Sequence, residues 1–310
     1  MTLVFIDGQA GTTGLQITQR LQCRTDIELL TLDDDERKSP ARRKAFLRDA
    51  DIAILCLPDD AARESVALAA GHTRILDAST AYRVDADWAY GLPELAEGQR
   101  ELISDAQFVS NPGCYPQGFI LMIRPLIEAG LLSAVLPLRC HAVSGYSGGG
   151  RQMIETRQAF SRAEIDRFNS QLYALTLDHK HVPEMHTYSR AEVRPLFSPS
   201  VAHYYKGMLV QIPLFLNELS GSVAEVHKVL TTRYATEQFV EVVALDAAVA
   251  PDGYLDPTAC NDTNRLQIMV LGNEEQVLLV ARYDNLGKGA SGAAIQNMNL
   301  MIGIDEAIGL

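Results

Sequence analysis

The sequence predicts an α/β protein whose first half is a doubly wound parallel sheet and whose second half is of α+β type. Short, continuously apolar segments alternate with helical segments through the first hundred residues, and strand-like segments dominate after residue 114. Continuous apolar strands are typical of a parallel sheet covered by helices on both faces. The change of pattern indicates a second domain with a mixed or antiparallel sheet.

The N-terminal elements follow from this alternation. Strands are expected at 3–6, 27–32, 51–57, 74–77 and 107–109, and helices at 11–21 and 60–70. In the second half, strands are expected at 138–144, 207–215, 239–245, 266–271 and 277–283, and helices at 119–127, 151–159, 163–172 and 222–234. Residues 287–308 are rich in small residues and predict a last helix that returns to the first domain. The expected domains are 1–113, completed by about 286–310, and 114–285.

Composition excludes several classes of protein. The 310 residues are 47% hydrophobic and 21% charged, as in an ordinary globular protein, and no apolar run is long enough to span a membrane. A net charge of −12 argues against nucleic acid and anionic membranes as partners. The five scattered cysteines do not form a disulfide framework, no Cys/His spacing fits a metal site, and the first residues lack a signal peptide. We expect a reduced, cytoplasmic protein.

A glycine-rich loop follows the first strand and opens the first helix. Its residues are Gly8, Gly11, Thr12, Thr13 and Gly14, in the spacing G-x-x-G-x-x-G. Glycines allow a pyrophosphate to approach the backbone, and the helix N-terminus offers N–H donors. The context of strand, turn and helix predicts a Rossmann-type dinucleotide-binding domain, with a plain glycine-rich turn as the alternative.

The end of the second strand bears on the choice of dinucleotide. The acidic run 33–36 suits a ribose hydroxyl and so favours NAD, whereas Arg37 and Lys38 directly after it suit a 2′-phosphate and so favour NADP. Local composition leaves both possibilities open, together with a solvated charged loop.

Cys114 occupies the most informative setting in the chain. An apolar strand runs into a tight Asn-Pro-Gly turn, Cys114 follows, and an apolar helix comes next with Pro116 in its first turn. Backbone N–H groups and the helix dipole favour a thiolate there. The pattern predicts a covalent nucleophile, with nearby Gln117 as a candidate for holding the oxyanion. A buried structural cysteine is the alternative.

His179, His181 and Glu184 lie in the segment His-Lys-His-Val-Pro-Glu. In an extended stretch the two histidines would point to the same face. A thiolate needs a partner that stabilises it and moves protons, and histidine does both near neutral pH. We favour His179 as the acid/base and His181 as a substrate contact. A surface pair or half of a metal site are the alternatives.

Two further loops carry small polar residues. The first, at 144–151, offers an anion nest through Ser144, Tyr146, Ser147 and Arg151, with a flexible glycine loop as the alternative. The second opens the last helix and contains Asn285, Gly287 and Gly289, which would let a flat ligand approach and would hydrogen-bond a carboxamide. A loop with a helix cap explains the second equally well.

With these residues in hand, the chain resembles the N-acetyl-gamma-glutamyl-phosphate reductase family, in particular its shorter type. The resemblance covers essentially the whole chain and rests on residues 8–14, 76–83, 90–95, 110–118, 144–151, 179–184 and 285–299. Asn-Pro-Gly-Cys-Tyr-Pro together with His-Lys-His-Val-Pro-Glu is the most specific part. In the nucleotide loop, Asp-Gly-Gln-Ala stands where longer relatives tend to have Gly-Ala-Ser-Gly.

The resemblance implies a fold, a reaction and partners. It implies a dinucleotide domain followed by an α+β catalytic and oligomerisation domain, as in aspartate-semialdehyde and glyceraldehyde-3-phosphate dehydrogenases. The implied enzyme of arginine biosynthesis uses NADPH to reduce N-acetyl-L-glutamyl 5-phosphate to the 5-semialdehyde and releases phosphate. Cys114 matches the nucleophile, the run 179–184 matches the catalytic histidine motif, and Ser79 falls in a matching motif assigned to the cofactor. A homo-oligomer, dimer or tetramer, is expected.

Three alternatives belong to different classes. An aspartate-semialdehyde dehydrogenase would perform the same chemistry on a shorter acyl phosphate. A nucleotide-sensing protein would have this fold without turnover, and Cys114 beside a histidine motif argues against it. A cysteine hydrolase would not need the glycine loop at Gly8.

Overall fold

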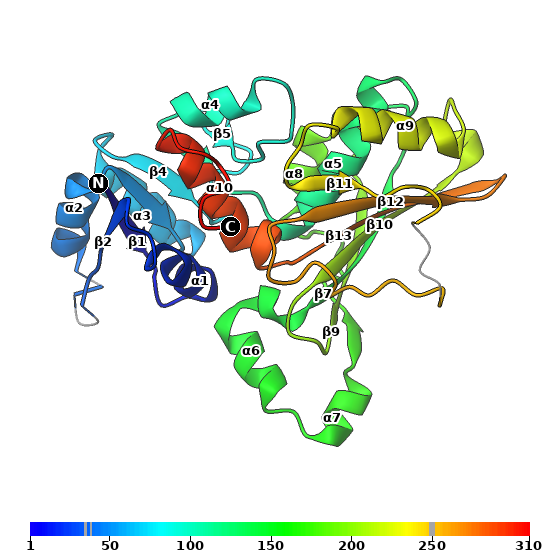
Figure 1. Cartoon of the computed structure of the whole chain (residues 1–310). Helices are drawn as coiled ribbons and strands as arrows, with labels where there is room; N and C mark the ends of the chain where they lie inside the picture. The colour runs from blue at the N-terminus through cyan, green and yellow to red at the C-terminus, as the bar shows by residue number, and fades with distance from the viewer. Residues whose placement is uncertain (34–35, 38, 248–251) are drawn as a thin grey trace. The chain divides into compact units, whose positions relative to one another are not determined.

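The computed structural model in Figure 1 describes residues 1–33, 36–37, 39–247 and 252–310. The chain divides into two compact units, one made of Met1–Gly113 with Ala290–Leu310 and the other of Cys114–Gly289. Lys38, which the sequence suggested as a cofactor contact, lies outside the described residues, as does part of the acidic run before it.

The first unit contains a six-stranded sheet in the order β2-β1-β3-β4-β6-β5, and its five neighbouring pairs are all parallel. Its strands are β1 (Thr2–Asp7), β2 (Ile27–Leu30), β3 (Ile52–Leu55), β4 (Arg74–Asp77), β5 (Ala89–Tyr90) and β6 (Phe108–Ser110). The predicted doubly wound parallel sheet is therefore confirmed. The strands expected at 27–32 and 51–57 are shorter than predicted, because the apolar runs continue past the last paired residue.

Helices cover both faces of this sheet, as Figure 1 shows. They are α1 (Thr12–Leu21), α2 (Pro40–Asp49), α3 (Asp59–Ala69), α4 (Gln99–Asp105) and α10 (Gly292–Met301). Alternate residues of β1 divide the core: Phe5 packs with α2 and α3, whereas Val4 and Ile6 pack with α1 and α10. The sequence analysis missed α2, which has a basic, weakly amphipathic sequence and begins with a capping Ser39 and Pro40.

The second unit contains a seven-stranded sheet in the order β11-β12-β13-β10-β7-β9-β8. Its strands are β7 (Arg139–Gly145), β8 (Ser170–Leu172), β9 (Leu196–Ala202), β10 (Met208–Phe215), β11 (Val240–Val242), β12 (Leu266–Gly272) and β13 (Gln276–Tyr283). The pairs β7–β9 and β11–β12 are parallel and the other pairs are antiparallel, so the predicted mixed sheet is confirmed.

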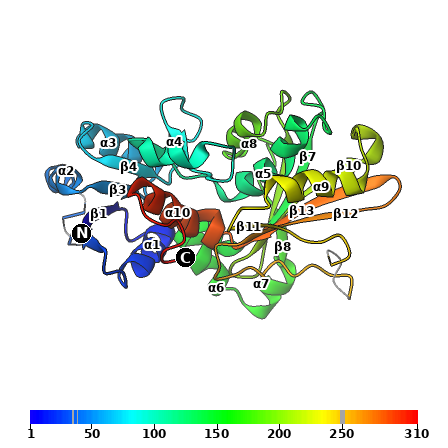
Figure 2. The ribbon, with the colours of Figure 1, turned by 45° about the horizontal axis from the view of Figure 1, so that its top comes forward.

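The long helix α5 packs on β10, β12 and β13, and α8 and α9 pack beside it (Figure 2). The helices of this unit are α5 (Cys114–Glu128), α6 (Gly150–Gln158), α7 (Arg162–Arg167), α8 (Val182–Tyr188) and α9 (Val223–Arg233), with short helical turns η1 (Tyr146–Gly149), η2 (Leu216–Glu218) and η3 (Gly287–Ser291). Twelve of the fifteen residues of α5 are buried, so this helix forms the core beneath the sheet.

Three predicted helices differ from the structure by several residues. The helix expected at 163–172 ends at Arg167, because Ser170–Leu172 pairs with β9 as strand β8. The last helix ends at Met301 rather than at 308 and is preceded by the π-type turn η3. The helix expected at 119–127 begins earlier, at Cys114 itself. No helix among the described residues has the length and apolar character needed to cross a membrane.

Candidate active site

The glycine loop of the first unit contains glycines of two kinds. Gly8 has a φ of +92°, and a Cβ there would lie 2.3 Å from the Cys56 carbonyl oxygen, while a Cβ on Gly14 would lie 2.5 Å from the Gly8 carbonyl oxygen. Packing therefore excludes any side chain at these two positions. Gly11 is different: it is exposed at the N-cap of α1, and a Cβ there would meet nothing closer than 3.4 Å.

The space at Gly11 fits the group that the loop was predicted to hold. The N–H groups of Thr12 and Thr13 belong to the first turn of α1, where a helix provides no carbonyl partner for them. An anion can approach these donors over the bare Cα of Gly11. The described residues of the loop are therefore compatible with a dinucleotide pyrophosphate.

Charges after β2 are partly paired within the protein. Arg42 holds Glu36 through two contacts, at 2.8 and 3.1 Å, and Glu36 is thereby less available to a ribose hydroxyl. Arg37 lies in the same turn. Ser79 uses its hydroxyl inside its own turn, since Oγ donates to Asp77 at 2.6 Å and accepts from the Ala81 N–H at 3.1 Å. We infer that Ser79 shapes the turn after β4.

Cys114 is the first residue of α5 and is partly buried. The charge on its sulfur helps to raise the pKa values of Tyr115, Tyr173 and Tyr283, in which burial is the largest cause. The backbone of Cys114 also contacts one of these phenols, since the Tyr283 hydroxyl donates to its carbonyl oxygen at 2.6 Å. Tyr173 donates a hydrogen bond to Tyr115 at 3.0 Å, which joins two of these phenols directly.

The same tyrosines hold the histidine motif. The His179 ring meets Tyr115 and Tyr173 edge-on, with centroid distances of 5.9 and 5.6 Å, and it lies 4.7 Å from the His181 ring. Tyr115, the residue that follows Cys114, therefore contacts both Tyr173 and His179. The sequence motifs predicted that the thiol and the histidines share a site, but they assigned no role to Tyr115 or Tyr173. No motif in the sequence around Tyr173 indicates a function for it.

The two histidines are adjacent for a different reason from the one predicted. An extended strand was expected to align them, but His181 has helical angles (φ −89°, ψ −11°) at the N-cap of α8, so that prediction is wrong. Instead, the His181 backbone N–H donates to His179 Nδ1 at 3.1 Å. Because a backbone N–H can only donate, Nδ1 accepts and the hydrogen of the neutral ring is on Nε2. His179 is thus oriented as a hydrogen-bond donor.

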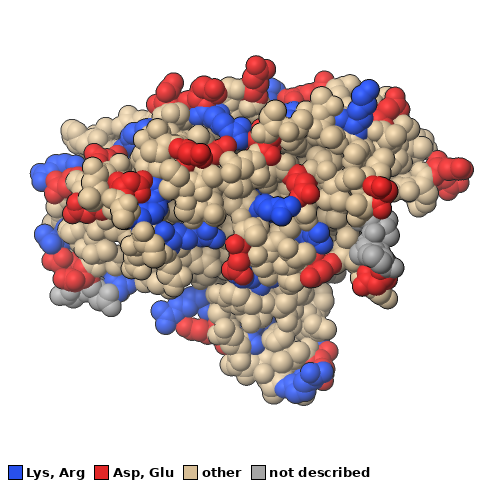
Figure 3. Space-filling model, in the orientation of Figure 1, with Lys and Arg blue, Asp and Glu red and all other residues tan. Residues whose placement is uncertain are grey.

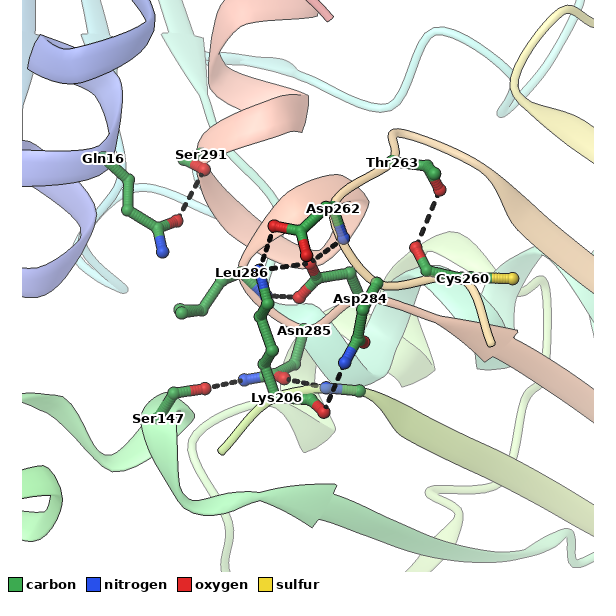
Figure 4. Close-up of polar contacts among 12 residues, drawn as sticks. Gln16, Ser147, Lys206, Cys260, Asp262, Thr263, Asp284, Asn285, Leu286 and Ser291 are labelled. Carbon is green, nitrogen blue, oxygen red and sulfur yellow. Dashed lines mark hydrogen bonds and ion pairs between the residues drawn. The ribbon is translucent and has the colours of Figure 1, made fainter. Parts of the chain in front are cut away.

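The loop after β7 is fastened by Asn285, as Figure 4 shows. Asn285 Nδ2 donates to Ser147 Oγ at 2.9 Å, and its Oδ1 accepts from the Gly207 N–H at 2.8 Å. Asn285 and Ser147 are both almost fully buried. Since Ser147 Oγ already accepts a hydrogen bond, its own hydrogen is available to donate to an anion.

The other predicted substrate contacts of the second unit lie on several different elements. Arg151 is exposed on α6 and pairs with Glu155 at 2.7 Å. Gln117 is fully buried and donates to the Lys288 carbonyl at 2.8 Å, so it joins α5 to η3. Ser144 and Glu184 are buried, and Tyr146 is half-buried in η1.

Gly287 and Gly289 are required by packing. A Cβ on Gly287 would lie 2.4 Å from the Thr263 carbonyl oxygen, and one on Gly289 would lie 3.0 Å from the Cys114 Cβ. Lys206 pairs with Asp262 and, at 3.7 Å, with Asp284, close to this turn (Figure 4).

Surface charge is mixed rather than concentrated. On the face drawn in Figure 3, basic and acidic side chains are interspersed. Among the described residues, no group of three or more His, Cys, Asp or Glu side chains is arranged to hold a metal ion.

Comparison with known proteins gives the family. The model of the semialdehyde dehydrogenase NAD binding domain matches residues 4–105, and that of the semialdehyde dehydrogenase dimerisation domain matches residues 114–285. Proteins of Brucella ovis and Brucella canis named N-acetyl-gamma-glutamyl-phosphate reductase are 53% identical to the chain over 306 residues, covering 97% of it and 98% of each relative.

The chain belongs to the N-acetyl-gamma-glutamyl-phosphate reductase family. The resemblance predicted from the motifs is therefore confirmed, as is the class of NAD(P)-binding oxidoreductase.

Solved structures agree with this membership at the level of the fold. Aspartate semialdehyde dehydrogenase from Francisella tularensis superposes with a TM-score of 0.73 at 13% identity, over 97% of this chain and 100% of that chain. The enzyme from Candida albicans, solved with NADP, superposes with a TM-score of 0.67 at 14% identity, over 97% and 98%.

The two kinds of loop glycine predict different phenotypes. We expect Gly11→Ala to leave the free energy of unfolding nearly unchanged and to raise the Kd for NADPH about tenfold, because its methyl group would occupy the approach to the backbone donors. Gly14→Ala is the matched control and should lose about 2 kcal/mol or more of stability, because its methyl group overlaps a backbone carbonyl. Denaturant unfolding and fluorescence titration measure the two quantities. Unaltered NADPH binding by Gly11→Ala would place the pyrophosphate elsewhere.

Proposed function

We propose that the protein reduces N-acetyl-L-glutamyl 5-phosphate to N-acetyl-L-glutamate 5-semialdehyde with NADPH and releases phosphate, a step of arginine biosynthesis. The observation that carries the proposal is that Tyr115, the residue after Cys114, contacts the His179 ring and accepts a hydrogen bond from Tyr173. The names of the close relatives supply the substrate and the reaction.

The first stage is acyl transfer to the protein. The Cys114 thiolate attacks the acyl carbonyl, an S–C bond forms, and the carbonyl electron pair moves to oxygen. The neutral His179 ring, oriented by the His181 N–H, donates from Nε2 to that oxygen. Collapse restores the carbonyl and breaks the C–O bond to phosphate, which leaves a thioester on Cys114.

The second stage is reduction of the thioester. NADPH, when bound, supplies the hydride for the thioester carbonyl, and the α1 N-terminus with Gly11 would hold its pyrophosphate. The oxyanion again receives the Nε2–H of His179. When the S–C bond breaks, its electron pair returns to sulfur, the aldehyde leaves and Cys114 is again a thiolate.

The phosphate group has a candidate donor in the second unit. Ser147 accepts a hydrogen bond from Asn285 and so presents its own O–H as a donor. Ser144, buried in the same loop, is the second candidate. Arg151 could bind an anion only by leaving Glu155, so we rank it behind the two serines.

NADP is favoured over NAD by the paired charges after β2. Arg42 neutralises Glu36, and the Arg37 side chain adds positive charge to the same turn. A 2′-phosphate therefore meets less repulsion here than the acidic sequence suggests.

Assembly and location extend the proposal. The family model that matches residues 114–285 is named for dimerisation, and we propose a homodimer or a tetramer. The five cysteines, all within the described residues, form no disulfide, which suits a reducing cytoplasm.

The decisive assay runs the reaction in reverse. N-acetylglutamate semialdehyde should reduce NADP⁺ only when phosphate is present, and NAD⁺ and aspartate semialdehyde are the parallel controls. Activity with aspartate semialdehyde alone would move the assignment to that enzyme. Nucleotide binding without either activity would favour a nucleotide sensor, and ester hydrolysis without nucleotide binding would favour a cysteine hydrolase.

Cys114→Ser should lose turnover by about 10³-fold or more while it binds NADPH normally, because a neutral hydroxyl is a far weaker nucleophile. Steady-state kinetics and nucleotide titration on the same preparation measure both. Retention of near-normal turnover would refute covalent catalysis by Cys114.

The donor role of His179 predicts a graded series. His179→Gln retains an N–H donor and should keep more activity than His179→Ala, which we expect to lose about 10²-fold or more in kcat. Equal losses in the two variants would contradict a donor role. A larger loss in His181→Gln would show that His181 is the group that serves the reacting oxygen.

The role of Asn285 can be tested without removing its bulk. Asn285→Asp keeps the oxygen that faces Gly207 but replaces the donor to Ser147, so we expect the KM for phosphate in the reverse reaction to rise about tenfold. Asn261→Asp is the control, because Asn261 Nδ2 donates to the neighbouring Lys206 carbonyl at 2.9 Å. A similar rise of the KM for phosphate in both variants would show that the added negative charge, and not the lost donor to Ser147, causes the effect.

A further inference from the structure

Tyr283 connects an interior strand of the second unit, β13, to the first turn of α5. It is the last residue of β13 and is fully buried. Its hydroxyl donates to the Cys114 carbonyl oxygen at 2.6 Å and accepts from the Gly118 N–H at 3.1 Å. These two backbone groups are four residues apart, the pair that closes one turn of an α-helix. The hydroxyl therefore contacts both ends of the turn that begins with Cys114.

Gly118 leaves room for this contact. A Cβ at this position would lie 2.9 Å from the Tyr283 hydroxyl oxygen, 3.0 Å from its Cε1 and 3.0 Å from the Ala281 Cβ. Any side chain at position 118 would therefore push the phenol away from the turn. The glycine and the tyrosine interlock, which fixes the first turn of α5 against β13.

The phenol keeps its hydrogen at neutral pH. Burial, followed by the charge of Cys114, raises the pKa of Tyr283 well above its ordinary value. The hydroxyl can therefore donate to the carbonyl and accept from the amide at the same time. Gln117 adds a second tie one residue earlier, since it donates to the Lys288 carbonyl.

We propose that Tyr283 is a positioning residue for the reaction: its hydroxyl holds the backbone of Cys114 so that the thiol keeps its place at the start of α5. This inference rests on Cys114 being the nucleophile of the proposed function. It assigns no contact with substrate to Tyr283. A misplacement of about 1 Å at a reacting atom costs up to about 10²-fold in rate, so a small relaxation of this turn has a large effect.

The chain contains a matched control on the same helix. Tyr234 is also buried, and its hydroxyl donates to the Leu121 carbonyl of α5 at 2.7 Å. Tyr283→Phe and Tyr234→Phe each remove one hydroxyl that bonds to the α5 backbone. Only the first hydroxyl bonds to the residue that carries the thiol.

The experiment follows both turnover and the thiol in the full-length protein. Alkylation of Cys114 by iodoacetamide is timed by peptide mass spectrometry, with exposed Cys23 of the same molecules as an internal standard for the reagent. For Tyr283→Phe we expect kcat and the Cys114 alkylation rate to fall about tenfold, with KM values changed less than about twofold. For Tyr234→Phe, both rates should stay within about twofold of the parent, whatever its loss of melting temperature.

The outcomes separate this inference from the proposed function. Equal kinetic effects of the two variants, or an unchanged Tyr283→Phe, would overturn the positioning role while inactive Cys114→Ser still supports the nucleophile. An active Cys114→Ser would overturn the nucleophile and the inference together.

A second variant applies if Tyr283→Phe folds poorly. Gly118→Ala keeps the phenol but displaces it, and it should slow Cys114 alkylation relative to Cys23 by a similar factor. Parental alkylation and kcat in folded Gly118→Ala would also overturn the inference.

Discussion

Three consecutive buried polar side chains at the end of β13 hold the second unit's site together. Tyr283 reaches the first turn of α5 and Asn285 reaches Gly207 and Ser147, as described above. Between them, Asp284 accepts hydrogen bonds from the Asp262 and Leu286 N–H groups, each at 2.9 Å. β13 is paired on both sides, with β10 and β12, so these side chains project from a rigid base.

Burial makes this arrangement specific. A buried polar group without a partner costs about 1–3 kcal/mol, so each of these side chains has one favourable geometry and few alternatives. Burying Asp284 without partners would cost the most free energy of the three, because its side chain is a carboxylate. Its two backbone N–H donors and Lys206, at 3.7 Å, compensate for that cost. The turn that begins with Cys114, the loop that contains Ser147 and the turn η3 are consequently ordered by the end of one strand.

The sequence could predict what depends on neighbouring residues. The glycine loop and the turn before Cys114 were recognised because strand, turn and helix lie next to one another in the chain, and both lie where they were expected. The tie between Tyr283 and Cys114 joins residues 169 positions apart, and that between Tyr173 and Tyr115 joins residues 58 apart. Neither spacing leaves a periodic signal, and a buried tyrosine in an apolar strand looks like any core residue. The prediction that an extended strand aligns His179 and His181 was wrong, because the alternation of side chains in the sequence does not show that His181 is a helix N-cap.

The same physics distinguishes Cys114 from the other cysteines. Burial, with the carboxylates of Asp77 and Asp7, raises the pKa of Cys56 to about 12, and burial also raises the pKa values of Cys140 and Cys260. These three remain thiols at neutral pH and are poor nucleophiles. Cys114 instead is a partly exposed residue that begins a helix, and its backbone is held by a phenol from β13. In the proposed positioning role of Tyr283, the reactivity of Cys114 depends less on the presence of a cysteine than on the strand that fixes its turn.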